Sequence, residues 1–343
     1  MHRAVAVPRK AAEKTRDRIV RARAHPNVAL VKYWGKRNWP LNLPSVGSIS
    51  LTLGALHTEV TVQPTSGSQD EYWSNGRLVE GPPLEDLRRF LDLFRRLADK
   101  KEPLAIRATS NFPVAAGLAS SASTFAALTV ALAAFYDLDL SKEHLGTLAR
   151  QGSGSACRSL WGGFVEWKRG ERSDGTDSFA VPLVSPRDWP VRVAVAVTDT
   201  RPKPTGSRLG MGRSEASPFF PAWVSSQEED LQAAREAIRA GDLERLGTVA
   251  ERNCLKMHAV AFTGDPPLVY WRPATLAVLE TVWQLRAEGV PAYFTIDAGP
   301  QVKVLCHAQD QATVQAALAA TQGVQEVFVC HPGTGAHLVE GCT

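Results

Sequence analysis

The sequence predicts an α+β fold made of two domains, and three observations support this. First, 343 residues are enough for two hydrophobic cores of medium size. Second, strand-like and helix-like segments are mixed in both halves, without the regular strand–helix alternation of a doubly wound sheet. Third, the proline-rich stretch 182–190 is the best candidate for a domain boundary. We therefore expect a basic flexible tail at 1–18 and domains at 19–190 and 191–343.

The first half contains short strands and one well-patterned amphipathic helix. Strands are predicted at 19–24, 48–53, 59–62, 104–110 and 164–167. Asn75 and Gly76, placed between two short apolar runs, predict a hairpin with a type I′ turn. A helix is predicted at 84–100 because apolar residues recur every three or four positions, at Leu84, Leu87, Leu91, Phe94 and Leu97. Further helices are expected at 121–136 and 142–151.

The second half repeats this mixture of elements. After a buried strand at 191–197, helices are predicted near 225–240, 242–257 and 273–288. Strands at 292–296 and 301–306, a helix at 310–321 and a final strand pair near 325–330 and 336–339 complete the chain. Strands and helices again do not alternate regularly, which favours α+β.

Composition and charge narrow the class of protein. Apolar residues make up 44% and charged residues 22% of the chain, as in soluble globular proteins. The net charge of +4 suits small anionic substrates but is too weak to indicate nucleic acid. Five scattered cysteines without a Cys-x-x-Cys pair argue against disulfides and structural zinc. With no apolar run of about 18 residues and no secretory signal in the basic stretch 1–23, we expect a cytoplasmic protein that is not bound to membranes.

The segment 29–37 (ALVKYWGKR) carries the first chemical signal. Lys32 and Lys36 flank an aromatic pair and a glycine shortly after a predicted strand. Lysine ammonium groups neutralise phosphate, and the hydroxyl of Tyr33 can donate to the same oxygens. The alternative is a solvated basic turn in which Trp34 packs on the core.

The segment 113–123 (PVAAGLASSAS) passes from glycine and small residues directly into a helix. Free amides at a helix N-terminus and the helix dipole favour anions, and serine hydroxyls can add donors or bind Mg²⁺. The segment lacks the Gly-Lys-Ser/Thr ending of a P-loop, so another phosphate-binding scheme is expected. The alternative is that Ser120 or Ser121 only caps the helix.

The segment 150–159 (RQGSGSACRS) places Arg158 three residues after Ser155, on the same side of a helical turn. A guanidinium with neighbouring hydroxyls suits a carboxylate, because its fork binds both oxygens. The alternative is a surface ion pair beside a glycine turn.

The segment 293–300 (YFTIDAGP) ends an apolar strand with Asp297, just before the chain must turn. A carboxylate there is rigidly held and suits a catalytic base, but it could equally cap the turn.

Together and in this order, these segments resemble the diphosphomevalonate decarboxylase family of the GHMP kinase superfamily. The matching pieces lie at 27–44, 111–123, 150–167, 256–271 and 294–300. The resemblance implies an N-terminal domain like domain 2 of ribosomal protein S5, a ferredoxin-like C-terminal domain and an active site between them. It also implies a homodimer that binds phosphorylated mevalonate and ATP.

The resemblance implies an activity as well. ATP would phosphorylate the 3-hydroxyl of (R)-5-diphosphomevalonate, and loss of phosphate and CO₂ would give isopentenyl diphosphate in the mevalonate pathway. Asp297, Lys32, Ser155 and Arg158 match the catalytic residues. The residues matching the substrate-binding set are Ala29, Tyr33, Lys36, Ser153, Ser155, Arg158, Ser207, Arg208 and Met211. Those matching the ATP site are Asn75, Gly117, Leu118, Ala119, Ser120 and Ser121, with Ser121 also expected at Mg²⁺.

Three departures from the family pattern concern substrate preference. Asn38 replaces an acid, 45–48 reads SVGS where Thr/Asn-Ser-Ser is usual, and Gln301 replaces a common asparagine. A decarboxylase of the 5-monophosphate, making isopentenyl phosphate, is therefore an alternative. The presence of Arg158 argues against a kinase that stops after phosphorylation. A nucleic-acid-binding protein is a remote alternative, because it would need basic residues gathered on one face.

Overall fold

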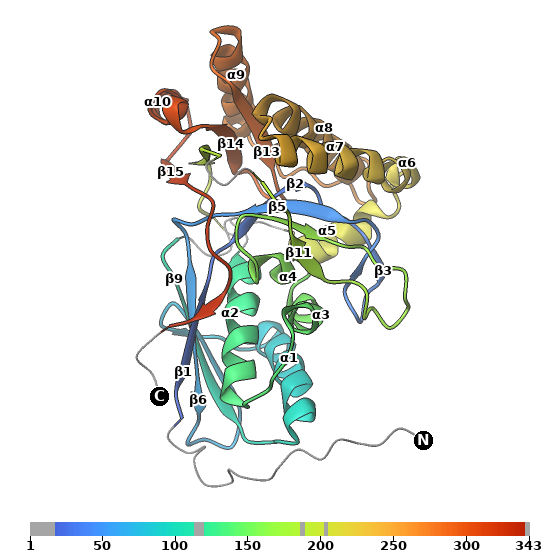
Figure 1. Ribbon diagram of the computed structural model, residues 1–343, viewed down its shortest axis with the longest axis vertical. Coiled ribbons are helices and arrows are strands. Elements are labelled where there is room, and N and C mark those ends of the chain that lie inside the picture. Colours follow the sequence, from blue (N-terminus) through green and yellow to red (C-terminus); the bar gives the residue numbers. More distant parts are fainter. Residues whose placement is uncertain (1–17, 113–119, 186–188, 202–204, 340–343) are drawn as a thin grey trace.

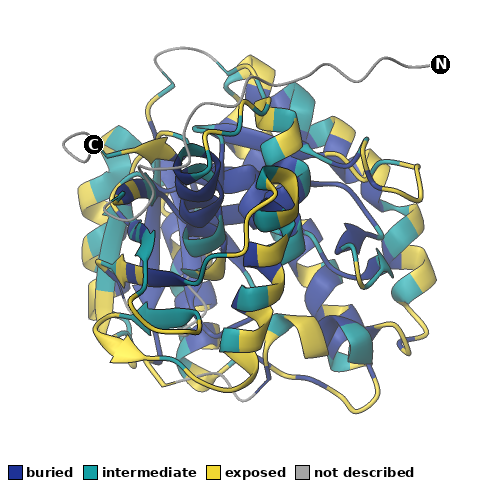
Figure 2. Ribbon diagram, turned by 90° about the horizontal axis from the view of Figure 1, so that it is seen from below, coloured by how far each residue is buried: buried dark blue, intermediate teal, exposed yellow. Residues whose placement is uncertain are grey.

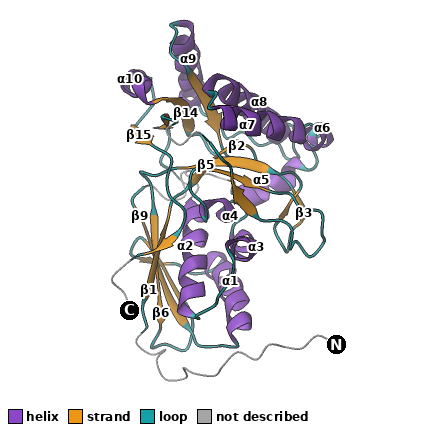
Figure 3. Cartoon of the chain, viewed as in Figure 1, coloured by secondary structure: helices purple, strands orange, loops and turns teal. Residues whose placement is uncertain are grey.

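The computed structural model describes residues 18–112, 120–185, 189–201 and 205–339. These residues form three main β-sheets and a short two-stranded ladder. In the view of Figure 1, the N-terminal half lies below, the helices of the C-terminal half lie above, and the sheet containing β2 and β5 lies between them. The predicted α+β mixture is thereby confirmed (Figure 3). Within these ranges no helix is both long and apolar enough to cross a membrane.

The first sheet has six strands in the order β16-β1-β6-β9-β7-β8. Their bounds are β1 Val20–Ala24, β6 Thr58–Pro64, β7 Glu71–Ser74, β8 Arg77–Leu78, β9 Leu104–Ser110 and β16 His337–Leu338. The accompanying helices are α1 Pro82–Ala98, α2 Ser120–Phe135 and α3 Lys142–Gly152. Helix α2 is buried along most of its length, because it packs on β1 and β6 and also touches α3 (Figure 2). The hairpin prediction is confirmed: Asn75 and Gly76 both have positive φ, as a type I′ turn requires.

The second sheet has the order β11-β10-β5-β2, with β2 Asn27–Val31, β5 Ser48–Thr52, β10 Phe164–Trp167 and β11 Ala180–Pro182. Every residue of β2 and β5 is buried. One hydrophobic core joins these strands to α7 Gln227–Ala240 and α8 Leu243–Phe262 of the C-terminal half. The two halves therefore share a continuous apolar contact, and this contact fixes the groups on β2 relative to those on the C-terminal strands.

The third sheet has the order β13-β14-β12-β15 and is antiparallel throughout. Its strands are β12 Val191–Val197, β13 Ala292–Ile296, β14 Val302–His307 and β15 Glu326–Cys330. In chain order this is the 4-1-3-2 arrangement of a βαββαβ unit, which confirms the ferredoxin-like prediction. Alternate residues of β12 face opposite sides: Val193 and Val195 face the core shared with β2, and Ala194 and Ala196 face α9 Pro273–Ala287 and α10 Gln311–Ala320.

One predicted pairing is wrong. The segments near 325–330 and 336–339 do not pair with each other: β15 pairs with β12, whereas β16 pairs with β1 of the first sheet. Between them the chain crosses over Leu53, where the amide of Gly333 donates to the carbonyl of Thr52. A Cβ at Gly333 would lie 2.8 Å from the backbone of Gly54, so only glycine allows this close crossing. The last strand thus returns to the sheet of the N-terminal half.

Several short elements were not predicted from the sequence. The ladder of β3 Lys36–Asn38 and β4 Leu43–Pro44 begins at the end of the first lysine segment. Helices α4 Ala156–Ser159, α5 Ser207–Ser214 and α6 Phe220–Ser225 are each eight residues or shorter. Helix α8 extends five residues beyond its predicted end at 257, which carries His258 into the buried region behind β13.

Candidate active site

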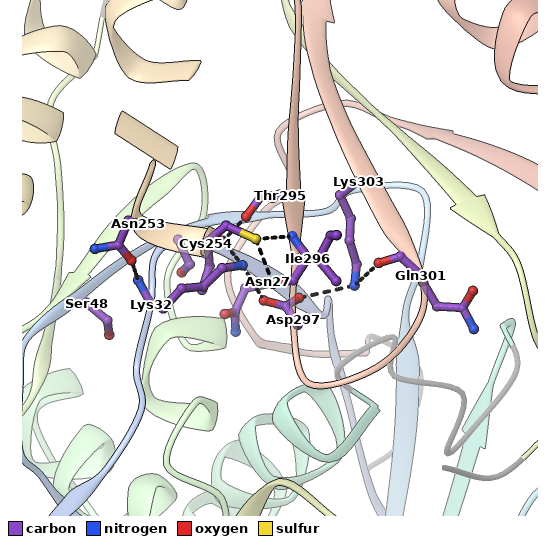
Figure 4. Close-up of polar contacts among 12 residues, drawn as sticks. Asn27, Lys32, Ser48, Asn253, Cys254, Thr295, Ile296, Asp297, Gln301 and Lys303 are labelled. Carbon is purple, nitrogen blue, oxygen red and sulfur yellow. Dashed lines mark hydrogen bonds and ion pairs between the residues drawn. The ribbon is translucent and has the colours of Figure 1, made fainter. Parts of the chain in front are cut away.

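The carboxylate of Asp297 lies between two buried lysines. Asp297 directly follows β13, and its Oδ1 is 2.8 Å from Nζ of Lys32. Its Oδ2 is 3.2 Å from Nζ of Lys303, which projects from the neighbouring strand β14. Figure 4 shows the carboxylate in the middle of this row, with one lysine on either side. The side chain of Asp297 is 24% exposed, whereas those of Lys32 and Lys303 are 1% and 3% exposed, so the acid is the accessible member of the three.

The two ammonium groups determine the charge of Asp297. Burial alone would raise the pKa of this carboxyl, but the charges of Lys32 and Lys303 outweigh burial and hold the pKa well below its ordinary value. Burial lowers the pKa of Lys303, and the charge of Asp297 opposes that effect. Asp297 is therefore ionised at neutral pH, and it serves better as an orienting negative charge than as a strong base.

Lys32 is held by side chains of the C-terminal half through its own backbone. Its amide donates to Oδ1 of Asn253 at 2.7 Å, and its carbonyl accepts from Nε2 of Gln227 at 2.8 Å. Asn253 in turn donates to Gln227 and to the fully buried carboxylate of Asp230. The ammonium of Lys32 also donates to the carbonyl of Ala29, at 2.8 Å. These contacts give the Lys32 ammonium one defined position beside Asp297.

Arg158 is buried, and its guanidinium donates hydrogen bonds only to neutral oxygens within the part of the chain that the structure describes. Its Nη1 donates to Oγ of Ser48 at 2.7 Å, and its Nε donates to Ser50 and to Asn27 at 3.0 and 3.1 Å. Asn27 also donates to the carbonyl of Ser155, which ties Arg158 to its own segment. Burial lowers the pKa of Arg158 from a very high value, so the guanidinium keeps its charge. It is therefore oriented and still able to bind a carboxylate.

Three serines connect the Arg158 segment to the start of α2. Oγ of Ser121 lies 3.2 Å from Oγ of Ser153, which lies 3.5 Å from Oγ of Ser155. Gly154, between the last two, packs against Tyr33: a Cβ there would lie 2.7 Å from Cε1 of the ring. The predicted phosphate-binding helix start and the predicted carboxylate-binding segment thus lie side by side.

The second part of the first lysine segment, with Tyr33 and Lys36, makes a different set of contacts. The ring of Tyr33 packs edge-on against Trp167 at 4.7 Å between centroids, and its buried hydroxyl has no hydrogen-bond partner among the described residues. The ammonium of Lys36 donates to Oδ1 of Asn42 and lies over the ring of Trp39. Burial, with a smaller contribution from the charge of Arg208, lowers the pKa of Lys36 to about 8. An anion bound here would reverse that shift.

The remaining predicted residues fall in different places. Ser207 and Arg208 begin α5, and Met211 of the same helix is buried in a core with Trp34 and Trp223, so its side chain packs rather than binds phosphate. Ser120 begins α2. Asn75 lies at the hairpin tip, where its Oδ1 accepts from the amide of Ser110. Gly117, Leu118 and Ala119 lie outside the described residues.

Magnesium fits this site only together with a phosphate ligand. Among the described residues there is no group of three or more acidic, histidine or cysteine side chains that could hold a metal. Asp297 is engaged by two lysines, and Ser121 supplies one exposed hydroxyl. Because Mg²⁺ is commonly bound by one or two protein groups plus nucleotide phosphates, Ser121 suits such an arrangement.

Sequence reasoning missed Lys303, Asn253 and Gln227, and it missed the hydroxyls of Ser48 and Ser50. Two signals were present. Lys303 is the one charge in the otherwise apolar run 302–306, and Ser48 and Ser50 alternate with apolar residues on a strand that proves fully buried. A polar residue repeated in a buried strand needs a partner. No local pattern marks Asn253 or Gln227, because their partner is a backbone group more than 190 residues away.

Known proteins match this chain along nearly all of its described length. Residues 24–180 match the diphosphomevalonate decarboxylase-like N-terminal domain, and residues 193–336 match the mevalonate 5-diphosphate decarboxylase C-terminal domain. A diphosphomevalonate decarboxylase of Ganoderma lucidum is 37% identical over 307 residues, which are 82% of this chain and 77% of the relative.

Two solved structures extend the match to three dimensions. One is a complex with MVAPP, AMPPCP and magnesium, with a TM-score of 0.88, 39% identity and coverage of 94% of this chain and 99% of the other. The second is the mevalonate diphosphate decarboxylase of Enterococcus faecalis, described for ATP binding mediated by mevalonate diphosphate, with a TM-score of 0.87 at the same identity and coverage. From its sequence, its two matched domains and its three-dimensional likeness, this chain belongs to the diphosphomevalonate decarboxylase family.

Proposed function

We propose that this protein catalyses the ATP-dependent decarboxylation of (R)-5-diphosphomevalonate to isopentenyl diphosphate, with ADP, phosphate and CO₂ as the other products. The observation that carries the proposal is the ionised carboxylate of Asp297, placed between Lys32 and Lys303 and close enough to Arg158 to interact with its charge. Related proteins bind MVAPP, AMPPCP and magnesium. The step belongs to the mevalonate route of isoprenoid synthesis.

In the first step, the 3-hydroxyl oxygen attacks the γ-phosphorus of ATP, and the bond from that phosphorus to ADP breaks. Asp297 accepts the hydrogen bond of the hydroxyl and orients it, and the hydroxyl proton passes to an oxygen of the transferred phosphoryl group as the new P–O bond forms. Phosphoryl transfer has a loose transition state, so orientation by Asp297 outweighs its basicity, in agreement with its low pKa. The ammonium of Lys32, beside the same carboxylate, stabilises negative charge on the transferred group.

In the second step, the C3–O bond breaks and phosphate leaves with the electron pair. Phosphate is a far better leaving group from a tertiary carbon than hydroxide. The C–C bond to the carboxylate then breaks, CO₂ is released, and that electron pair forms the terminal double bond. Asp297 stabilises the positive charge that develops on C3, while Arg158 holds the carboxylate so that its bond is aligned with the empty orbital. Ser153 and Ser155 are proposed to bind the carboxylate and the 3-hydroxyl.

The phosphorylated ends of the two substrates are assigned to separate groups. Tyr33, Lys36, Ser207 and Arg208 are proposed to bind the diphosphate of the substrate, with Ala29 and Met211 lining the same site. Residues 117–121 are proposed to bind the ATP phosphates, and Asn75 is proposed to lie near the adenosine. Mg²⁺ would neutralise charge on the nucleotide phosphates, with Ser121 as its protein ligand.

One assay tests the proposal against the 5-monophosphate alternative. The protein is incubated with Mg-ATP and, separately, with mevalonate, its 5-phosphate and its 5-diphosphate, while ADP and CO₂ are both followed. We expect equal amounts of both products from the diphosphate. ADP without CO₂ would indicate a kinase, and both products from the monophosphate alone would indicate the sister decarboxylase. Steep salt-dependent RNA binding without ATP turnover would instead support nucleic-acid binding.

Three further predictions from the sequence, namely the dimer, the location and the domain boundary, are part of this proposal. The protein is proposed to act as a homodimer in the cytoplasm, with its domains divided near residue 190. Sedimentation of the purified chain at several concentrations would test the dimer, because a monomer mass throughout would contradict it.

A further inference from the structure

Lys303 is the second cation on the Asp297 carboxylate, and it comes from a strand outside every motif that indicated the site. In the antiparallel register it lies opposite Thr295 on β13. Its ammonium lies 3.2 Å from Oδ2 of Asp297 and 3.4 Å from the carbonyl of Gln301. In Figure 4 it approaches the carboxylate from the side opposite to Lys32. Each carboxylate oxygen thus has a lysine of its own.

A lysine at this position is costly. Its neighbours Val302 and Val304 are completely buried, and Lys303 itself is only 2% exposed. A buried ion pair generally adds little stability compared with apolar residues of similar volume, because both charges lose their hydration. A methionine would fit the same strand without that loss. The contact with Asp297 therefore indicates that the charge of Lys303 has a functional role and not only a role in the stability of the sheet.

The three groups differ in how far they are exposed to solvent. Asp297 is the partly exposed member, whereas both lysine side chains are almost fully covered. A substrate hydroxyl can therefore reach the carboxylate, whereas the two ammonium groups are covered.

We propose that Lys303 is a positioning residue, which holds Oδ2 of Asp297 so that the carboxylate keeps one orientation and its negative charge throughout turnover. This proposal rests on the decarboxylase function proposed above. During phosphoryl transfer it prevents the carboxylate from rotating toward Lys32. When phosphate leaves and positive charge develops on C3, it keeps the stabilising oxygen in place.

Several other titratable groups face Asp297. Lys32 follows β2, Arg158 lies on α4, and Cys254 and His258 lie on α8. Burial raises the pKa of Cys254 and lowers the pKa of His258 to about 3, so both are neutral at the pH of an assay. The charges that act on Asp297 are therefore those of Lys32, Lys303 and Arg158, and removing Lys303 alone changes one of three.

The first test replaces Lys303 with methionine, with Lys100→Met on the surface as the matched control. We expect kcat to fall about 10- to 100-fold, as for a misplaced catalytic group, while KM for ATP stays within about twofold. Lys303→Arg, which keeps the charge, should recover part of the loss. If Lys303→Met has the kcat of the Lys100→Met control, the proposal is wrong.

The second test asks whether Lys303 acts through Asp297. In an Asp297→Asn background, Lys303→Met should change the residual rate less than about threefold, because the carboxylate that it positions is gone. A full loss in both backgrounds would assign Lys303 a merely structural role.

A third measurement needs no substrate and separates this proposal from the proposed function. A carboxyl with a depressed pKa stabilises the fold above its unfolded pKa, and this stability is lost as pH falls toward the folded pKa. Because removal of Lys303 raises the folded pKa of Asp297 toward its unfolded value, thermal unfolding from about pH 6 down to about pH 2 should show a smaller loss of stability in Lys303→Met than in the wild type. Asp297→Asn should abolish this difference. If it persists in Asp297→Asn, Lys303 does not act on Asp297, whatever the activity of the wild type.

Discussion

The proposed reacting end of the site, around Asp297, and its proposed phosphate end, around Tyr33 and Lys36, differ in how their charges are partnered. At the reacting end, the protein itself supplies both cations for Asp297. At the phosphate end, Lys36 meets a neutral amide oxygen, and the hydroxyl of Tyr33 has no hydrogen-bond partner among the described residues. The first arrangement is complete without substrate, whereas the second is completed by an anion. If the proposed roles hold, the catalytic groups are oriented in advance, and affinity for the diphosphate comes from a lysine and a tyrosine that have no anionic partner in the part of the chain that the structure describes.

The largest effect should come from the reacting end. Asp297→Ala removes the negative charge that orients the hydroxyl and stabilises C3, and it leaves two buried ammonium groups without their anion. We expect kcat for CO₂ release to fall by at least about 10³-fold, with nucleotide affinity nearly unchanged. Rapid-quench assays and titration with a fluorescent nucleotide would measure the two quantities. Turnover near the wild-type rate would exclude the proposed role of Asp297.

Arg158→Lys tests the proposed binding site for the substrate carboxylate. The lysine keeps a positive charge but loses the fork that meets Ser48 and Ser50 and that is proposed to hold the substrate carboxylate. Loss of charge-assisted hydrogen bonds worth about 1.5–3 kcal/mol predicts a decrease of about 10- to 100-fold in kcat. Steady-state kinetics would show this, and normal activity would remove Arg158 from the proposed carboxylate site.

Asn253→Ala tests whether the reacting end depends on the C-terminal half for its shape. The substitution leaves the amide of Lys32 without its acceptor and Asp230 without one donor. We expect a loss of about 1–3 kcal/mol in the free energy of unfolding and about a tenfold decrease in kcat from the misplaced ammonium. Asn111→Ala, at an exposed asparagine that also accepts from a backbone amide, is the control. An equal effect in both variants would refute a special role for the Asn253 contact.

The smallest effect concerns the phosphate end and depends on pH. With a pKa of about 8, Lys36 loses its charge as pH rises from 7 to 9, so KM for the phosphorylated substrate should increase several-fold over that range. Lys36→Arg should keep KM low and remove the dependence on pH. Lys36→Met should give a high KM that does not change with pH. An identical pH response in the wild type and Lys36→Arg would assign the dependence to another group.

Much of the fold was predictable because it depends on local patterns. The apolar period of α1 and the Asn75-Gly76 turn are properties of a few consecutive residues, and the helices and strands around them follow the same rules. The partners of the last two strands were not predictable. The residues of β15 and β16 read as strands, but their partners lie in two different sheets, more than 120 residues away. Strand period does not specify which strand is the neighbour.

The same distinction between local patterns and long-range contacts applies to the active site. The sequence by itself determined the kinds of groups present, namely the lysine segment, the small-residue helix start, Arg158 beside serines and Asp297 at a strand end, because each is a short run of adjacent residues. Only the tertiary structure decided that Lys303 shares the carboxylate with Lys32, and that Asn253 and Gln227 hold Lys32 in place. The physical reason is that hydrogen bonds and Coulomb interactions depend on distances of a few ångströms in space, and packing of β2 against α8 creates those distances between residues more than 200 positions apart.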